Sequence, residues 1–162
     1  MHQSNAGRRV GRVVAIWRFP VKSMAGEPLL QCEVGWHGLA GDRRWAFVRD
    51  GVPQSGFPWL TLRERGDMAQ YQPRFLEPDR PDKSPTVVQT PTGATLDVAG
   101  PALARALAPA GARAIRQDRG VFDTFPLSLI TTQTVAWLGA QVGTPLAVGR
   151  FRPNLLVEAH DG

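Results

Sequence analysis

The chain carries charged and amide side chains directly before an apolar segment near its end. Residues 150–154 read RFRPN and lead into the apolar residues 155–157. The guanidinium of Arg152 is a planar fork of five donors that suits bidentate binding of a phosphate or carboxylate. Pro153 favours extended backbone at Arg152, and Asn154 adds a donor and an acceptor. The segment predicts an anion clamp at the start of a strand, with a solvated turn as the alternative.

Two earlier loops present basic side chains in the same way. In FPVKSM, a proline ends an apolar segment, and the ammonium of Lys22 and the hydroxyl of Ser23 follow at a rigid corner. In GLAGDRRW, Gly41 permits close approach of the backbone, and Asp42 can hold Arg43 in orientation. An inert surface ion pair is the alternative for Arg43.

A fourth loop, LITTQT, combines two hydroxyls with the expected start of a helix. Thr131 or Thr132 can cap this helix, and its free N–H groups would form an anion site. A plain capping role is the alternative for both threonines. Each of the four loops alone is weak evidence for a binding site, but together they predict one site for a phosphate-bearing ligand.

Arginine supplies most of the positive charge of this chain. Its 162 residues have a formal net charge of +5, and Lys22 and Lys83 are the only lysines. The hydrophobic fraction of 43% and the charged fraction of 20% are typical of a soluble globular protein of one domain or a compact pair. The basic balance fits oxyanion recognition and leaves nucleic acid open as a partner.

Cysteine and histidine are too few and too scattered for common metal or disulfide frameworks. Cys32 is the only cysteine, which excludes an internal disulfide and a four-cysteine zinc site. Cys32 is predicted to be a small buried hydrophobe in a strand. The histidines His2, His37 and His160 show no ligand spacing. Since no apolar segment has the length of a signal peptide core or a membrane span, we expect no membrane and a cytoplasmic location.

Short strands and turns are predicted along most of the chain, because 14 prolines and 17 glycines interrupt it. We expect strands over residues 12–19, 29–34, 45–48 and 86–89, hairpin turns at 50–51 and 92–93, and a long loop over 73–91. A helical turn over 103–107 and one main helix over 133–142, with Gly143 as its C-cap, complete the pattern. The fold class is α+β and β-rich, barrel- or sandwich-like, with predicted core anchors at Trp17, Trp36, Trp45, Trp59 and Trp137.

Four segments in this order resemble the MOSC family, which is named for the C-terminal domain of molybdenum cofactor sulfurase. They read IWRFPVKSMAGE, GLAGDRRWAFV, PLSLITTQTVAWL and RFRPNLLVE. The resemblance is to bacterial hydroxylaminopurine-resistance reductases and mitochondrial amidoxime-reducing components, and residues 74–121 are its divergent part. It implies a flexible N-terminus over residues 1–10, a barrel-like MOSC N-terminal domain over 11–120, and the beginning of a MOSC β-barrel over 121–162.

The resemblance implies a molybdenum cofactor, molybdopterin, held in a basic cleft. The lysine–serine pair of the family contacts the phosphate and pterin, and the arginine and asparagine of its Arg-Pro-Asn signature bind the pterin side. Carried onto this sequence, the implied cofactor-binding residues are Lys22, Ser23, Arg43, Thr131, Thr132, Arg152 and Asn154. At the family level, pyridoxal phosphate binding stays open as well.

The implied activity is reduction of N-hydroxylated small molecules by the cofactor, with electrons from a flavin or iron–sulfur reductase. The family's metal-ligating cysteine lies well beyond the Arg-Pro-Asn strand, so the sequence, which ends at Gly162, is expected to be truncated before it. Cys32 does not replace that ligand by position, and no residue of this chain is assigned to the metal or to catalysis. Two alternatives stay open: a non-catalytic binder or carrier of molybdopterin or another phosphorylated small molecule, and a basic module for nucleic acid, which the loop-bound arginines disfavour.

Overall fold

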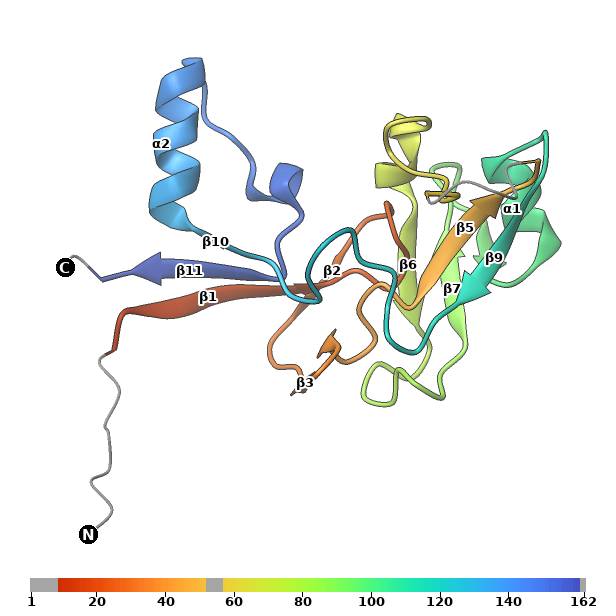
Figure 1. The fold of residues 1–162 in the computed structure, drawn as a ribbon, viewed down its shortest axis with the longest axis horizontal. Helices are drawn as coiled ribbons and strands as arrows, with labels where there is room; N and C mark the ends of the chain where they lie inside the picture. Colours follow the sequence, from red (N-terminus) through yellow and green to blue (C-terminus); the bar gives the residue numbers. More distant parts are fainter. Residues whose placement is uncertain (1–8, 52–56, 161–162) are drawn as a thin grey trace, which may run out of the picture.

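The computed structural model describes residues 9–51 and 57–160, so most of the N-terminus that was predicted to be flexible lies outside the described residues. The fold is mixed α+β and rich in strands, as predicted (Figure 1). The α-helices are α1 (Pro101–Leu107) and α2 (Thr132–Val142). The strands are β1 (Gly11–Arg18), β2 (Glu27–Leu29), β3 (Val34–Gly35), β4 (Gly38–Leu39), β5 (Trp45–Arg49), β6 (Gln72–Phe75), β7 (Thr86–Gln89), β8 (Thr95–Asp97), β9 (Ala112–Arg116), β10 (Leu129–Thr131) and β11 (Leu155–Ala159).

Strands from the two ends of the chain share one sheet. Its order is β10-β11-β1-β2, with β1 antiparallel to both neighbours and β10 parallel to β11. This sheet and α2 lie on one side of the molecule, and the ladders β5-β9 and β6-β7-β8 lie on the other (Figure 1). The predicted domain boundary at residue 120 stays a prediction, and β1 is hydrogen-bonded to strands on both sides of it.

The apolar core fixes the first basic loop on both flanks. The buried cluster comes from residues 21–107 and packs β5, β7 and α1 together. Val21 and Met24 belong to this cluster and are fully buried. Since they flank Lys22 and Ser23 directly, burial of their apolar side chains holds the loop that presents these two polar groups.

Two sequence expectations about strands are wrong. The strand predicted over residues 29–34 does not form: β2 ends at Leu29, Leu30 is fully exposed, and Cys32 is only half-buried in a loop. The long loop predicted from residue 73 contains β6, which pairs with β7. Pro73 argues against a strand in the sequence because it lacks an N–H. However, β6 lies at the edge of its sheet, where a missing N–H is tolerated.

The tryptophans are not all core anchors. Trp36 and Trp137 are exposed, with relative accessible surfaces of 96% and 62%, which corrects the prediction for both. Trp36 lies in the turn between β3 and β4, and Trp137 lies in α2. Trp45 is partly buried against the core and donates from Nε1 to Thr86 Oγ1 at 3.2 Å.

The turn and cap signals of the sequence are confirmed where the structure describes them. Strands β7 and β8 form a hairpin through Gly93, which has φ of 89°. Helix α2 ends at Gly143 in the left-handed conformation, as the C-cap signal predicts. The predicted turn at residues 50–51 is described only to Gly51, because residues 52–56 lie outside the described part.

Replacing Thr131 by alanine should destabilise the protein by about 1 kcal/mol. Thr131 Oγ1 accepts the N–H of Thr134 at 3.0 Å, and alanine leaves this end of α2 without an acceptor. Urea unfolding followed by circular dichroism measures the effect. Thr144→Ala is the matched control, since Thr144 is exposed and lies beyond the C-cap of α2. Equal loss in both variants would contradict the capping role.

Candidate functional site

A cavity of about 500 Å³ brings together four of the seven predicted site residues: Lys22, Ser23, Arg43 and Arg152. We call it the basic pocket. Its other walls come from the loop between β9 and β10, the loop around Arg63, and the 3-10 helix Val148–Phe151. Four basic side chains and one carboxylate, that of Asp123, line it. This volume is that of a typical small-ligand site.

The backbone is strained at three residues of the basic pocket. Ser23, Arg43 and Arg152 have φ of 67°, 49° and 51°, and in residues 9–51 and 57–160 they are the non-glycine residues with positive φ. Such conformations are costly and cluster at functional sites. The extended conformation predicted for Arg152 is therefore wrong. Arg152 ends the preceding 3-10 helix in the left-handed region, and its N–H donates to Gly149 O at 3.2 Å.

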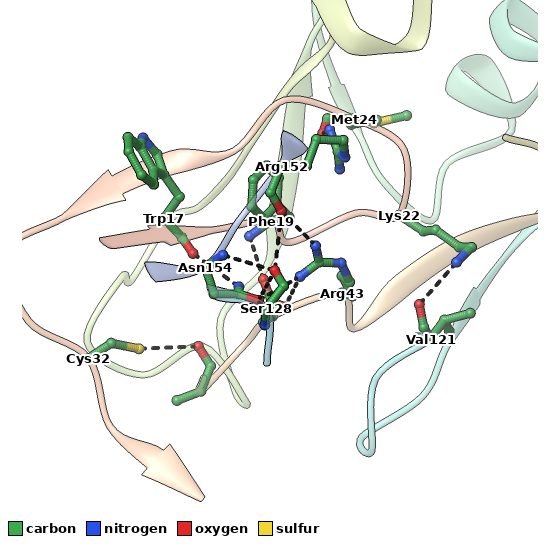
Figure 2. A network of polar contacts seen from close by, with 12 residues as sticks. Trp17, Phe19, Lys22, Met24, Cys32, Arg43, Val121, Ser128, Arg152 and Asn154 are labelled. Carbon is green, nitrogen blue, oxygen red and sulfur yellow. Dashed lines mark hydrogen bonds and ion pairs between the residues drawn. The ribbon is translucent and has the colours of Figure 1, made fainter. Parts of the chain in front are cut away.

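Two guanidinium groups of the basic pocket lie against one aromatic ring. Arg43 and Arg152 lie 4.8 and 4.4 Å from the centre of the Phe19 ring (Figure 2). Contacts of this kind favour a cation over an aromatic face. Arg43 Nη2 also donates to the carbonyl of Arg152 at 3.2 Å, so the two arginines are placed as one unit.

Asp42 holds Arg43 in orientation, as the sequence predicts. Its side chain is completely buried, accepts the N–H of Phe19 at 2.7 Å and forms an ion pair with Arg43. Burial raises the pKa of Asp42 in spite of the opposing effect of Arg43. Close packing at Gly41 keeps this corner in place, because a Cβ there would lie 2.7 Å from Pro81 Cβ.

Arg152 forms no ion pair with a described carboxylate, and one of its donors is unused. Its Nη1 donates to the carbonyl of Met24, but its buried Nη2 has no hydrogen-bond partner among the described residues. Burial, and then the neighbouring charge of Arg43, lower the pKa of Arg152 to about 10. A partly buried cation with an unused, buried donor is unfavourable by itself, and an anionic ligand would supply both the missing charge and the missing acceptor.

Asn154 does not line the basic pocket but supports it through buried hydrogen bonds. Its completely buried side chain donates from Nδ2 to Trp17 O at 3.1 Å. Its Oδ1 accepts from Arg43 Nη1 at 3.2 Å and from Ser128 N at 3.1 Å. Figure 2 shows these groups gathered around Phe19. Asn154 thus joins β1, the loop before β10 and the arginine pair, and its predicted contact with a cofactor stays a prediction.

The two threonines do not join the other predicted site residues. Thr131 caps α2. Thr132 lines a different, mostly apolar cavity of about 550 Å³ between α2 and the segment that follows it. The capping alternative therefore describes Thr131, and a threonine-to-ligand contact has no support from the basic pocket.

Lys22 lines the basic pocket together with the arginine pair. It is 5% exposed, and its Nζ donates to Asp123 Oδ1 at 2.6 Å and to Val121 O at 3.4 Å. The Phe57 ring lies 5.7 Å from the same nitrogen. Sequence reasoning missed Asp123 and Arg63, because neither belongs to a motif. Ser128 was missed too, although it stands inside PLSLITT, the segment used for the resemblance.

Cys32 lies apart from the arginine pair (Figure 2). It lines another cavity, of about 750 Å³, together with Arg18. Burial raises the pKa of its thiol, so the thiolate that a metal requires is disfavoured. No group of three histidine, cysteine, aspartate or glutamate residues gathers as a metal site within the described ranges.

The family model described as the MOSC N-terminal beta barrel domain matches residues 10–118, more than half of the chain. The chain belongs to the MOSC family. This family is associated with the molybdenum cofactor. The match covers Lys22, Ser23 and Arg43, whereas Thr131, Thr132, Arg152 and Asn154 follow it in sequence. The search of curated proteins found no significant match.

The MOSC N-terminal domain thus contributes one half of the basic pocket, and residues 121–152 contribute the other half. None of the described helices is long and apolar enough to cross a membrane.

Proposed function

We propose that the basic pocket binds the phosphate-bearing pterin of the molybdenum cofactor. The observation that carries the proposal is the state of Arg152: a partly buried, strained cation beside a second arginine, with one buried donor unused. Residues that cost stability in this way are retained where a ligand uses them. A phosphate supplies both the missing charge and the missing acceptors.

The residues present fit the anionic part of this cofactor. Lys22 and Arg43 offer donors from two walls of the pocket, and the hydroxyl of Ser23 lies next to Lys22. Asp42 and Asn154 hold Arg43 in place, so its guanidinium is preorganised and loses little freedom on binding. When bound, the cofactor supplies molybdenum redox chemistry, and we propose reduction of N-hydroxylated compounds with electrons from a partner reductase.

A non-catalytic binder or carrier of molybdopterin is the second candidate. It is favoured by the position of Cys32, which lines a separate cavity and leaves the basic pocket without a thiol among the described residues. The two candidates share the phosphate site and differ in the metal content of the purified protein.

Pterin should copurify with the chain from a host that makes the molybdenum cofactor, and Lys22→Ala/Arg152→Ala should lower the amount at least about tenfold. Each substitution removes a charge-assisted contact to the ligand phosphate, worth about 1.5–3 kcal/mol. Fluorescence of the oxidised pterin measures the amount, and elemental analysis counts molybdenum. Lys83→Ala/Arg150→Ala is the matched control, because it removes the same charge from exposed side chains outside the pocket.

Pterin retained by the double variant, or absent from the well-folded parent, would contradict the proposed site. Pterin with stoichiometric molybdenum supports the oxidoreductase. Pterin without molybdenum supports the carrier.

A further inference from the structure

Lys22 and Asp123 form an ion pair, and both line the basic pocket together with Arg43 and Arg152. We propose that Asp123 is an internal counter-anion: its carboxylate takes the position of a ligand phosphate on Lys22 and must leave it when the ligand binds. This inference rests on the proposed function and adds a residue that sets the affinity and selectivity of that site.

The two partners of Lys22 differ in how firmly they are held. Val121 is 3% exposed, and its N–H donates to Arg43 O at 2.8 Å, so its carbonyl is a fixed acceptor. The side chain of Asp123 is 72% exposed and lies in the segment between β9 and β10, which has no regular structure at this point. Its carboxylate reaches Lys22 at 2.6 Å. The carboxylate can therefore swing into solvent while the backbone keeps its place.

A buried ammonium needs a counter-charge, and Asp123 is the only carboxylate that lines the described part of the pocket. Asp123 forms its ion pair with Lys22 and leaves Nη2 of Arg152 without a hydrogen-bond partner among the described residues. A phosphate dianion carries more charge and more acceptor oxygens, so one group could meet Lys22 and the arginines together. The exchange then favours multiply charged oxyanions over monovalent ones.

Asp123→Asn should tighten binding of inorganic phosphate about fivefold, because a partly exposed ion pair no longer competes for Lys22. Isothermal titration calorimetry on the full chain at physiological ionic strength gives the dissociation constant. Asp118→Asn is the matched control: it removes the same charge from the same segment, and Asp118 pairs with Arg116 outside the pocket. Its affinity for phosphate should stay within about 1.5-fold of the parent. Asp123→Ala should reproduce the gain.

Thermal unfolding keeps the test independent of a folding defect. Without phosphate, Asp123→Asn should unfold at a lower temperature than the parent, since Lys22 is left without a counter-charge. Saturating phosphate should stabilise this variant more than the parent, as its tighter binding requires.

Lys22→Ala distinguishes failure of the counter-anion role from failure of the phosphate site itself. If Lys22→Ala weakens phosphate binding but Asp123→Asn and the parent bind equally, the counter-anion role is overturned and the phosphate site stands. If Lys22→Ala binds phosphate as well as the parent, or no form binds it, the proposed site and the counter-anion role both fail. An equal gain in Asp118→Asn would also overturn the role, because net charge alone would explain it.

Discussion

Replacing Asp42 by alanine should lower the free energy of unfolding by about 3–5 kcal/mol. The completely buried carboxylate accepts the N–H of Phe19 at 2.7 Å and is the ion-pair partner of Arg43. Alanine leaves a buried N–H without an acceptor and two neighbouring guanidinium groups, those of Arg43 and Arg152, without a negative charge between them. Urea unfolding at neutral pH measures the loss.

Asp42→Asn should cost about half as much, which separates the hydrogen bond from the charge. Asparagine keeps an acceptor for the N–H of Phe19, and the raised pKa of Asp42 shows that burial already makes its negative charge expensive. Asp118→Ala is the control for an exposed carboxylate and should change stability by less than about 0.5 kcal/mol. If Asp42→Ala proved as stable as the parent, Asp42 would not be what holds the arginine pair.

Local signals in the sequence were sufficient for the elements with strong periodicity or strong caps. The apolar β-branched run before Pro20 predicted β1, and the threonine and Gly143 signals predicted α2 and its ends. The same local logic failed at residues 29–34, where the alternation was loose and the chain turns instead. Propensity alone does not decide such short apolar segments.

The candidate site was predicted only in part. The chemistry of each residue can be read from its local sequence, but which loops meet in space cannot. Lys22, Arg43 and Arg152 were singled out from loop composition, and the structure places them around one pocket. Their meeting depends on the pairing of β1 with β11, which no local pattern encodes. Thr131 failed to join them because a helix cap and a ligand-binding hydroxyl give the same sequence signal.

Two features of the pocket could not be predicted from the sequence. The sequence predicts Phe19 only as the end of a strand, whereas both arginines lie against its ring. Arg152 precedes a proline, which favours extended backbone, but tertiary structure holds it in the left-handed region. The departure of Arg152 from the local rule falls where a ligand site is proposed, as expected for residues selected for binding.

Arg152→Met should stabilise the protein by about 1–2 kcal/mol while removing pterin binding. The lowering of the pKa of Arg152 to about 10 corresponds to about 3 kcal/mol of cost for its charged form. Methionine removes this cost and the unused Nη2 donor but loses the hydrogen bond to Met24 O. Urea unfolding at pH 7 gives the sign. Arg150→Met, at an exposed arginine of the same segment, should change neither stability nor binding.

The pH dependence gives an independent test of the same cost. Because the folded pKa of Arg152 lies below its ordinary value, the cost is fully present below about pH 10 and is relieved as the pH rises through that value. The gain of Arg152→Met over the parent should therefore begin to shrink near pH 10 and keep shrinking as the pH rises towards the ordinary pKa of arginine. A variant less stable than the parent at pH 7 would make Arg152 a structural cation. If Arg152→Met gains stability and loses pterin, Arg152 lowers the stability of the fold and is retained for ligand binding.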